Sequence, residues 1–187
     1  MIELLARRRG MGEVKDDPII EFDDSNVKAK CVSGYGGATG GSAPTSYRIG
    51  GVKVIGKAGE ITYKQAESVL TFPQGTTGIF LDGTYTSFNE LQYFTHCTKI
   101  NSKAFQASTF SGTITFPSSL TSIGSKAFYS LNCPRLIFLS TTPPTMSDFA
   151  QTNHVTRVYV PDESVDTYKT AWSSWASKIK SINELST

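Results

Sequence analysis

A short motif that occurs twice, 23 residues apart, most limits the folds open to this chain. Residues 101–105 read Asn-Ser-Lys-Ala-Phe, residues 124–128 read Gly-Ser-Lys-Ala-Phe, and an isoleucine lies five positions before each phenylalanine. An apolar pair follows nine and eleven positions after each phenylalanine. The landmarks are Phe105, Ile114 and Phe116 in the first copy, Phe128, Ile137 and Leu139 in the second, and Phe149, Val158 and Val160 in a weaker third copy.

The alternating apolar pair predicts a short strand whose apolar side chains point inward, while the phenylalanine fills the space under the following turn. A period of 20–29 residues with one strand per copy is typical of leucine-rich repeats, whose copies must stack and be capped. We therefore expect an α+β fold: a short leucine-rich-repeat-type β-solenoid stack with a small α/β N-terminal cap and a C-terminal capping helix. Phe105, Phe128 and Phe149 would occupy equivalent rungs. The alternative is an ordinary antiparallel β-domain with a fortuitous duplication.

The repeat segment also resembles a known family. Residues 120–128, Leu-Thr-Ser-Ile-Gly-Ser-Lys-Ala-Phe, preceded by Ile-Thr-Phe-Pro-Ser-Ser at 114–119, resemble the BspA-type leucine-rich repeats common in Bacteroides-like gut bacteria and some protists. Residues 84–94 look like the usual lead-in of that family, and residues 141–145 and 158–172 look like its usual ending. The first copy departs from the family by placing Ser108 and Ser111 where Cys and Leu are usual. The resemblance implies adhesion-type binding of a protein or glycan, outside the cell or at its surface.

Upstream, residues 59–69 are similar to an EF-hand-like segment that often precedes these repeats. With Gly59 at the sixth loop position, Val54, Gly56 and Ala58 take positions one, three and five, and Gln65 takes position twelve. None of these residues is a carboxylate that could hold Ca²⁺, so we expect a degenerate loop without metal.

The chain divides by its patterns into four parts. We expect a flexible leader (1–17), an N-terminal cap with the degenerate EF-hand-like segment (18–83), the repeats (84–161) and a C-terminal capping helix and tail (162–187). Within the N-terminal cap the sequence predicts a strand at about 18–22, a helix capped by Asp24 or Ser25, and a glycine-rich loop at 34–51. That loop lacks the features of a phosphate-binding loop. A strand at 52–56 and a helix with a Thr62–Gln65 capping box follow, with an apolar face of Ala66, Val69 and Leu70.

The C-terminal segment predicts a helix that closes the stack. Asp162 is the expected N-cap, and Glu163 would favour the positive end of the helix dipole. Val165, Tyr168, Trp172 and Trp175 recur at helical spacing and form a stripe suited to covering an open core. The alternative for Trp172 and Trp175 is an exposed platform for carbohydrate.

Composition argues against several function classes. A formal net charge of +2 gives no electrostatic basis for binding nucleic acid, and no run of 18 apolar residues predicts a membrane span. The three cysteines (Cys31, Cys97 and Cys133) fit neither a disulfide framework nor a zinc site, so we expect buried thiols. With only His96 and His154 as histidines, we expect no metal site and no cofactor. The first twelve residues do not match a secretory signal; we expect a frayed terminus, or alternatively a short amphipathic helix that docks on a partner.

These features predict a non-catalytic binding or adhesion module for a protein or glycan. The alternative is a structural component of a phage, prophage or cell-surface appendage, which would make the protein virion-associated. An enzyme is disfavoured because His154 has no inferable nucleophile partner. The carboxylates Asp16, Asp17, Asp23 and Asp24 are more typical of solvated caps than of a glycosidase pair. We predict no catalytic residues; the ligand, the binding face and the oligomeric state stay open.

Overall fold

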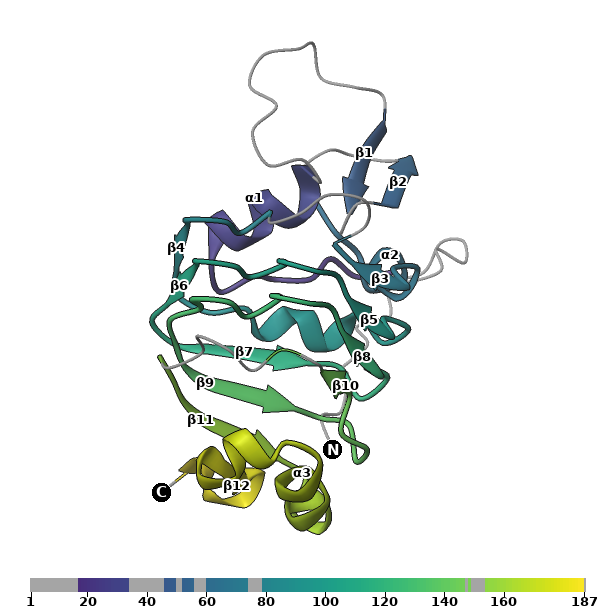
Figure 1. The fold of residues 1–187 in the computed structure, drawn as a ribbon. Coiled ribbons are helices and arrows are strands. Elements are labelled where there is room, and N and C mark those ends of the chain that lie inside the picture. Colours follow the sequence, from purple (N-terminus) through teal and green to yellow (C-terminus); the bar gives the residue numbers. More distant parts are fainter. Residues whose placement is uncertain are drawn as a thin grey trace.

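Short parallel strands from successive turns of the chain lie side by side in the computed structural model, which describes residues 17–33, 46–49, 52–55, 60–73, 79–146, 148 and 154–186. The turns of the chain form a stack (Figure 1), with α1 (Ser25–Ser33) at one end and α3 (Val165–Ala171) at the other. We call each turn of the stack a coil. Helices are few and short, and they lie in the two end regions and in one 3₁₀ helix of the first coil, Asn89–Tyr93. The predicted parallel-strand repeat stack is confirmed.

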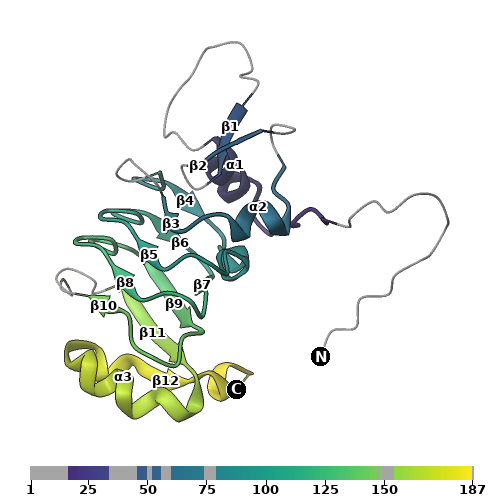
Figure 2. The ribbon, with the colours of Figure 1, turned by 90° about the vertical axis from the view of Figure 1, so that its right-hand side faces the viewer.

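Two four-stranded parallel sheets lie on different sides of the stack (Figure 2). The first sheet consists, in order, of β12 (Ile179–Ser181), β11 (Val155–Val160), β9 (Cys133–Phe138) and β7 (Thr113–Phe116). The second consists of β10 (Thr145–Met146), β8 (Ser122–Ile123), β5 (Lys99–Ile100) and β3 (Thr71–Phe72). A parallel pair, β4 (Thr84–Tyr85) and β6 (Thr109–Phe110), forms a third side. Parallel pairing on every side follows from a chain that winds in one direction.

The strand register corrects one part of the predicted repeat. In the first sheet Ile114 pairs with Leu136 and Leu136 with Val158, so the inward residues of β9 are Leu136 and Phe138. The prediction of Ile137 and Leu139 for these positions was wrong. The cause is that the second repeat has one residue fewer than the first between these two pairs. The bridged residues Thr109 and Asn132 are 23 positions apart, whereas the next paired residues, Thr113 and Arg135, are 22 apart.

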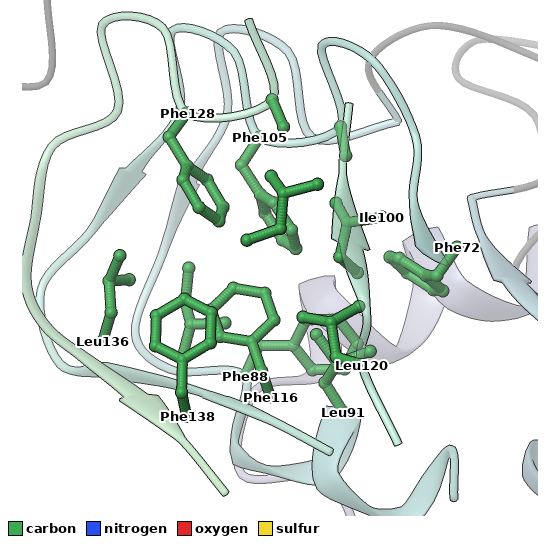
Figure 3. Close-up of a cluster of buried hydrophobic side chains, with 14 of the residues drawn as sticks. Phe72, Phe88, Leu91, Ile100, Phe105, Phe116, Leu120, Phe128, Leu136 and Phe138 are labelled. Carbon is green, nitrogen blue, oxygen red and sulfur yellow. The ribbon is translucent and has the colours of Figure 1, made fainter. Parts of the chain in front are cut away.

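Aromatic rings fill the interior and stack from one coil to the next (Figure 3). The Phe105 and Phe128 rings are neighbours, with centroids 6.1 Å apart, and both side chains are fully or almost fully buried. On the side of the first sheet, Phe116 and Phe138 stack at 4.6 Å with an interplanar angle of 10°. The equivalence of Phe105 and Phe128 is therefore confirmed. Phe149, the third predicted rung, lies outside the described residues.

The turns after the second sheet repeat their backbone conformation as well as their sequence. Lys103 and Lys126 both adopt a positive φ, near 59° and 57°, and Ala107 and Ser130 both adopt a φ of 54°. The N–H of Phe105 donates to the carbonyl of Ala127 in the next coil at 2.9 Å. The repeated motif therefore specifies a turn whose backbone hydrogen bonds run between coils.

The structure of the N-terminal cap agrees in part with the elements predicted from the sequence. Asp24 is the N-cap of α1, as predicted, because its Oδ1 accepts hydrogen bonds from the N–H groups of Asn26 and Val27. The predicted strand at 18–22 is reduced to a single bridge, Ile19–Thr62. The glycine-rich segment is not all loop, because β1 (Ser46–Ile49) pairs antiparallel with β2 (Val52–Ile55), the predicted strand at 52–56.

The helix α2 (Tyr63–Glu67) begins with the predicted capping box, in which Thr62 and Gln65 bond reciprocally. The helix is short, so Ala66 and Val69 are buried but Leu70 is 61% exposed, which makes the prediction for Leu70 wrong. Of the EF-hand-like loop, Val54 lies in β2 and Gln65 serves the capping box, while residues 56–59 lie outside the described residues. The EF-hand likeness and the absence of a metal remain predictions.

The C-terminal cap closes the stack with aromatic side chains. Tyr168, Trp172 and Trp175 are at most 2% exposed, and the Trp175 ring stacks on Phe128 at 6.3 Å. The indole N–H of Trp172 donates to the carbonyl of Pro144 at 3.1 Å, which satisfies its one polar group. The core interpretation of the two tryptophans is thereby confirmed, and a carbohydrate platform on them is wrong.

The start of this cap differs from the prediction. A 3₁₀ turn, Asp162–Ser164, precedes α3, and Asp162 is the N-cap of neither, since Pro161 takes that position for the turn and Ser164 for α3. The 3₁₀ turn is closed by the backbone instead, because the N–H of Ser164 donates to the carbonyl of Pro161 at 2.9 Å. Two further 3₁₀ helices, Ser173–Lys178 and Ile182–Ser186, flank β12.

Truncating a capping tryptophan should destabilise the whole stack. Trp172 is 2% exposed and lies 5.0 Å from the Phe138 ring, so Trp172→Ala leaves a cavity at the end of the core. We expect a loss of about 3–5 kcal/mol in the free energy of unfolding, measured by urea denaturation. Lys169→Ala, an exposed change on the same helix, is the control. An unchanged midpoint for Trp172→Ala would contradict the capping role.

Gly124 is the position where neighbouring coils approach most closely in the repeated motif. A Cβ at this residue would lie 2.8 Å from the carbonyl carbon of Asn101 and 2.9 Å from the Cα of Ser102, closer than real Cβ atoms come. Because both contacts are with backbone, Gly124→Ala should push two coils apart and cost about 1–3 kcal/mol in thermal or urea unfolding. The exposed neighbour Ser125→Ala should change stability by much less, and equal effects of the two variants would refute this close approach.

Candidate binding surface

The outer face of the first sheet carries its side chains in straight rows. Because strand side chains alternate, the inward position of Leu136 and Val158 sends the residues on either side of each outward. One row contains Thr113, Arg135 and Arg157, which are register partners on β7, β9 and β11. The neighbouring row contains Thr115, Ile137, Tyr159 and Lys180. We call the set Thr113, Arg135, Arg157, Tyr159 and Lys180 the arginine face.

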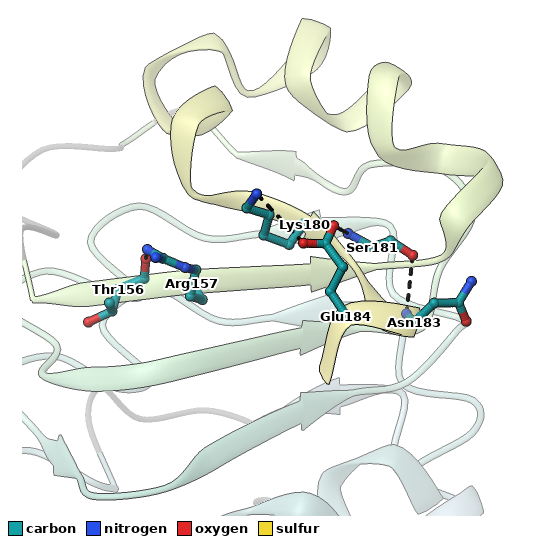
Figure 4. A network of polar contacts seen from close by, with 6 residues as sticks. All are labelled: Thr156, Arg157, Lys180, Ser181, Asn183 and Glu184. Atoms are coloured by element: carbon teal, nitrogen blue, oxygen red, sulfur yellow. Dashed lines mark hydrogen bonds and ion pairs between the residues drawn. The ribbon is translucent and has the colours of Figure 1, made fainter. Parts of the chain in front are cut away.

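Arg135 and Arg157 are the exposed cations of this face. The Arg157 guanidinium donates through Nη1 to the carbonyl of Thr156, its own neighbour in sequence, at 3.1 Å (Figure 4). Within the part of the chain that the structure describes, neither guanidinium forms an ion pair. Parallel strands lie about 4.8 Å apart, so two residues of like charge are neighbours across the sheet.

Lys180, on the edge strand β12, differs from the arginines because a carboxylate holds it. Its Nζ lies 3.6 Å from Glu184 Oε2, and the other oxygen of Glu184 accepts from the N–H of Ser181 at 3.2 Å. Figure 4 shows this network beside Arg157. The unpaired positive charge of the face therefore resides on the two arginines.

Sequence reasoning named no site residues, and it missed this pair. Each arginine stands one position before the inward residue of its strand, and the two lie 22 residues apart. The signal was present, but the predicted register, which placed Ile137 inward, concealed it. With Leu136 inward, Arg135 and Arg157 fall in one row.

The three cysteines are buried thiols, as predicted. Burial raises the pKa of Cys97 and of Cys133 to about 11 in each case, and burial together with the charge of Glu90 raises the pKa of Cys31. A thiol with a raised pKa is a poor nucleophile because the thiolate is the reactive form. The histidines His96 and His154 are both exposed.

The acidic residues near the N-terminus serve as local structural groups. Asp17 accepts hydrogen bonds from the Thr62 hydroxyl at 2.6 Å and from the N–H of Lys64 at 3.0 Å, at the start of α2. Asp24 is buried, so the prediction of a solvated cap was wrong for it. Its Oδ2 accepts from the N–H and hydroxyl of Thr86, at 2.6 and 2.9 Å, which ties the N-terminal cap to the first coil. Asp16 lies outside the described residues.

The two buried carboxyl groups at this junction have opposite pKa shifts. Burial would raise the pKa of Asp24, but the hydrogen bonds from Thr86 and from the first turn of α1 outweigh burial and lower it. Burial raises the pKa of Glu90, and the charges of Asp23 and Asp24 add to the rise. Glu90 Oε1 accepts from the N–H of Asp23 at 2.8 Å, whereas Oε2 is buried without a hydrogen-bond partner.

Among the described residues, no group of three or more His, Cys, Asp or Glu side chains is arranged to hold a metal ion. No helix in the described ranges has the length and apolar character to span a membrane.

Replacing Glu90 should change the pH dependence of stability. The folded protein keeps the proton on the Glu90 carboxyl group to higher pH than the unfolded chain does. The stability that comes from protonated Glu90 is therefore fully present below the ordinary glutamate pKa of about 4.5, and it is lost as pH rises through the raised pKa. Glu90→Gln keeps an acceptor for Asp23 and cannot ionise. We expect the melting temperature of Glu90→Gln, relative to that of the unchanged protein, to rise as the pH increases from about 4.5 through the raised pKa of Glu90. The exposed Glu163→Gln is the control; a parallel pH trend for both variants would contradict the assignment.

Comparison with known proteins agrees with the repeat architecture. A family model described as "BspA type Leucine rich repeat region (6 copies)" matches residues 83–187. No curated protein matches the chain. The family match begins at the first coil and extends through the C-terminal cap. Since it covers more than half of the 187 residues, the protein belongs to the BspA-type leucine-rich repeat family.

Proposed function

We propose that this chain is a non-catalytic binding module that presents a leucine-rich-repeat surface to a protein or glycan partner. The observation that carries the proposal is the in-register first sheet, which sets outward side chains in rows. Such rows give a ligand repeated contacts from a rigid scaffold, as in other stacked repeat proteins. The family match to a repeat region supports the same role.

The groups that could perform chemistry support a role without catalysis. The thiols are buried with raised pKa values, and the carboxyl groups Asp17 and Asp24 are engaged in capping and in joining the N-terminal cap to the stack. We propose further that the module acts outside the cell or at its surface, in adhesion. This step is supported by the likeness to the BspA-type family alone.

The binding role can be tested with an array of glycans and extracellular host proteins probed with the labelled full chain. We expect at least one ligand, and we expect Tyr159→Ala to weaken its binding by about tenfold, because this half-buried ring lies within the arginine face. Tyr129→Ala, at a half-buried tyrosine in the turn after the second sheet, is the matched control and should leave affinity unchanged. Melting curves verify that both variants fold.

The possible outcomes separate the alternatives. Binding of no ligand at high protein concentration would contradict a binding module and favour a structural component of a virion or appendage. A ligand that binds Tyr159→Ala as tightly as the unchanged protein would place the binding surface on another part of the chain.

A further inference from the structure

The middle of this chain carries no carboxylates, so its few basic residues leave it with a positive net charge. No Asp or Glu occurs between residues 91 and 147, a stretch that contains Lys99, Lys103, Lys126 and Arg135. All 16 Asp and Glu residues therefore lie before residue 91 or after residue 147. Arg135 lies within this stretch, so an anionic ligand at Arg135 would meet no carboxylate from residues 91–147.

Arg135 and Arg157 form the one in-register pair of cations in the described part of the first sheet. Like charges directly opposite one another on neighbouring strands are unfavourable in the free protein. Neither arginine has a carboxylate partner among the described residues, whereas Lys180 in the next row has Glu184. A bound anion would relieve this repulsion, so the free-energy gain from binding would include it.

We propose that the arginine face binds an acidic polysaccharide whose uronic acid carboxylates are held by Arg135 and Arg157. This inference rests on the binding role proposed above and names its ligand class. A guanidinium presents two parallel N–H donors that match a carboxylate. The spacing of neighbouring strands is close to the length of one sugar residue in an extended polysaccharide, so consecutive residues of such a chain can meet both arginines.

The other members of the face suit a sugar. The Tyr159 ring lies in the adjoining row and can cover the C–H side of a pyranose, and the Thr113 hydroxyl, in register with Arg135, can bond a ring hydroxyl. Both side chains are half-buried and held by the sheet, which reduces the entropy lost on binding.

An acidic peptide fits this face less well. Peptides that bind sheets gain much of their affinity from main-chain hydrogen bonds at a free strand edge. The strands β9 and β11 are internal, each paired on both sides, so their backbone groups are already used. A ligand at Arg135 and Arg157 must be recognised by side chains alone, as a polysaccharide is.

The test uses the full chain and polygalacturonate as the acidic polysaccharide, with neutral dextran and poly-glutamate as comparison ligands. We expect polygalacturonate to bind, dextran not to bind, and added salt to weaken the binding. The double variant Arg135→Gln/Arg157→Gln should weaken it by at least about tenfold. Lys99→Gln/Lys103→Gln removes the same charge at two exposed positions, one on β5 of the second sheet and one in the turn that follows, and it should change affinity by less than about twofold.

Every other result overturns the proposal in a recognisable way. Equal losses in the two double variants would show attraction by overall charge without a site. Tighter, arginine-dependent binding of poly-glutamate would identify an acidic protein as the partner. If the array yields a Tyr159-dependent ligand but polygalacturonate does not bind, the acidic-polysaccharide proposal fails while the binding module stands. If nothing binds in either experiment, both fail.

Discussion

The backbone of every coil leaves N–H and C=O groups directed along the stack, and these groups must be satisfied by the next coil. In the two sheets the partners are strands, and in the turns they are residues such as Phe105 and Ala127, whose backbone hydrogen bond is 2.9 Å long. Buried backbone groups without partners are costly, so each coil must repeat the path of its neighbour closely. The stacked rings of Phe116 and Phe138, which are register partners on β7 and β9, depend on that register, because one residue of slip would turn an inward side chain outward.

A stack held in this way has two ends, and the chain closes them by different means. At the C-terminal end Tyr168, Trp172 and Trp175 extend the aromatic interior, and the indole and phenol groups donate to carbonyls of the 140–144 turn. At the N-terminal end polar groups make the junction: Asp24 joins α1 to Thr86, and Glu90 accepts from the backbone of Asp23. One end therefore depends chiefly on apolar burial and the other also on two buried carboxyl groups, whose pKa values shift in opposite directions.

The sequence predicted the features that repeat and failed where a feature occurs once. The motif around Phe105 and Phe128 was sufficient for the stack, and the tryptophan spacing was sufficient for the C-terminal cap. The next coil has one residue fewer than the first coil at the corner formed by residues 110–112. For this reason the predicted inward positions of β9 were wrong by one residue. Helical spacing also predicted a longer apolar face at Leu70, but α2 ends at Glu67. Asp162 has the residue type of an N-cap, yet a backbone-closed 3₁₀ turn takes that position.

The same one-residue shift explains why the candidate binding surface was not predicted from the sequence. With Ile137 assigned inward, Arg135 would also point inward, since the two differ by two positions, and a buried unpaired guanidinium would have been implausible. The actual register buries Leu136 and Val158 and turns Arg135 and Arg157 outward into one row. Ile137, which faces outward with them, is 7% exposed, whereas the two arginines in the neighbouring row are exposed. The geometry that fills the core thus also sets the two arginines on neighbouring strands, so a ligand that contacts both must span the separation of two strands.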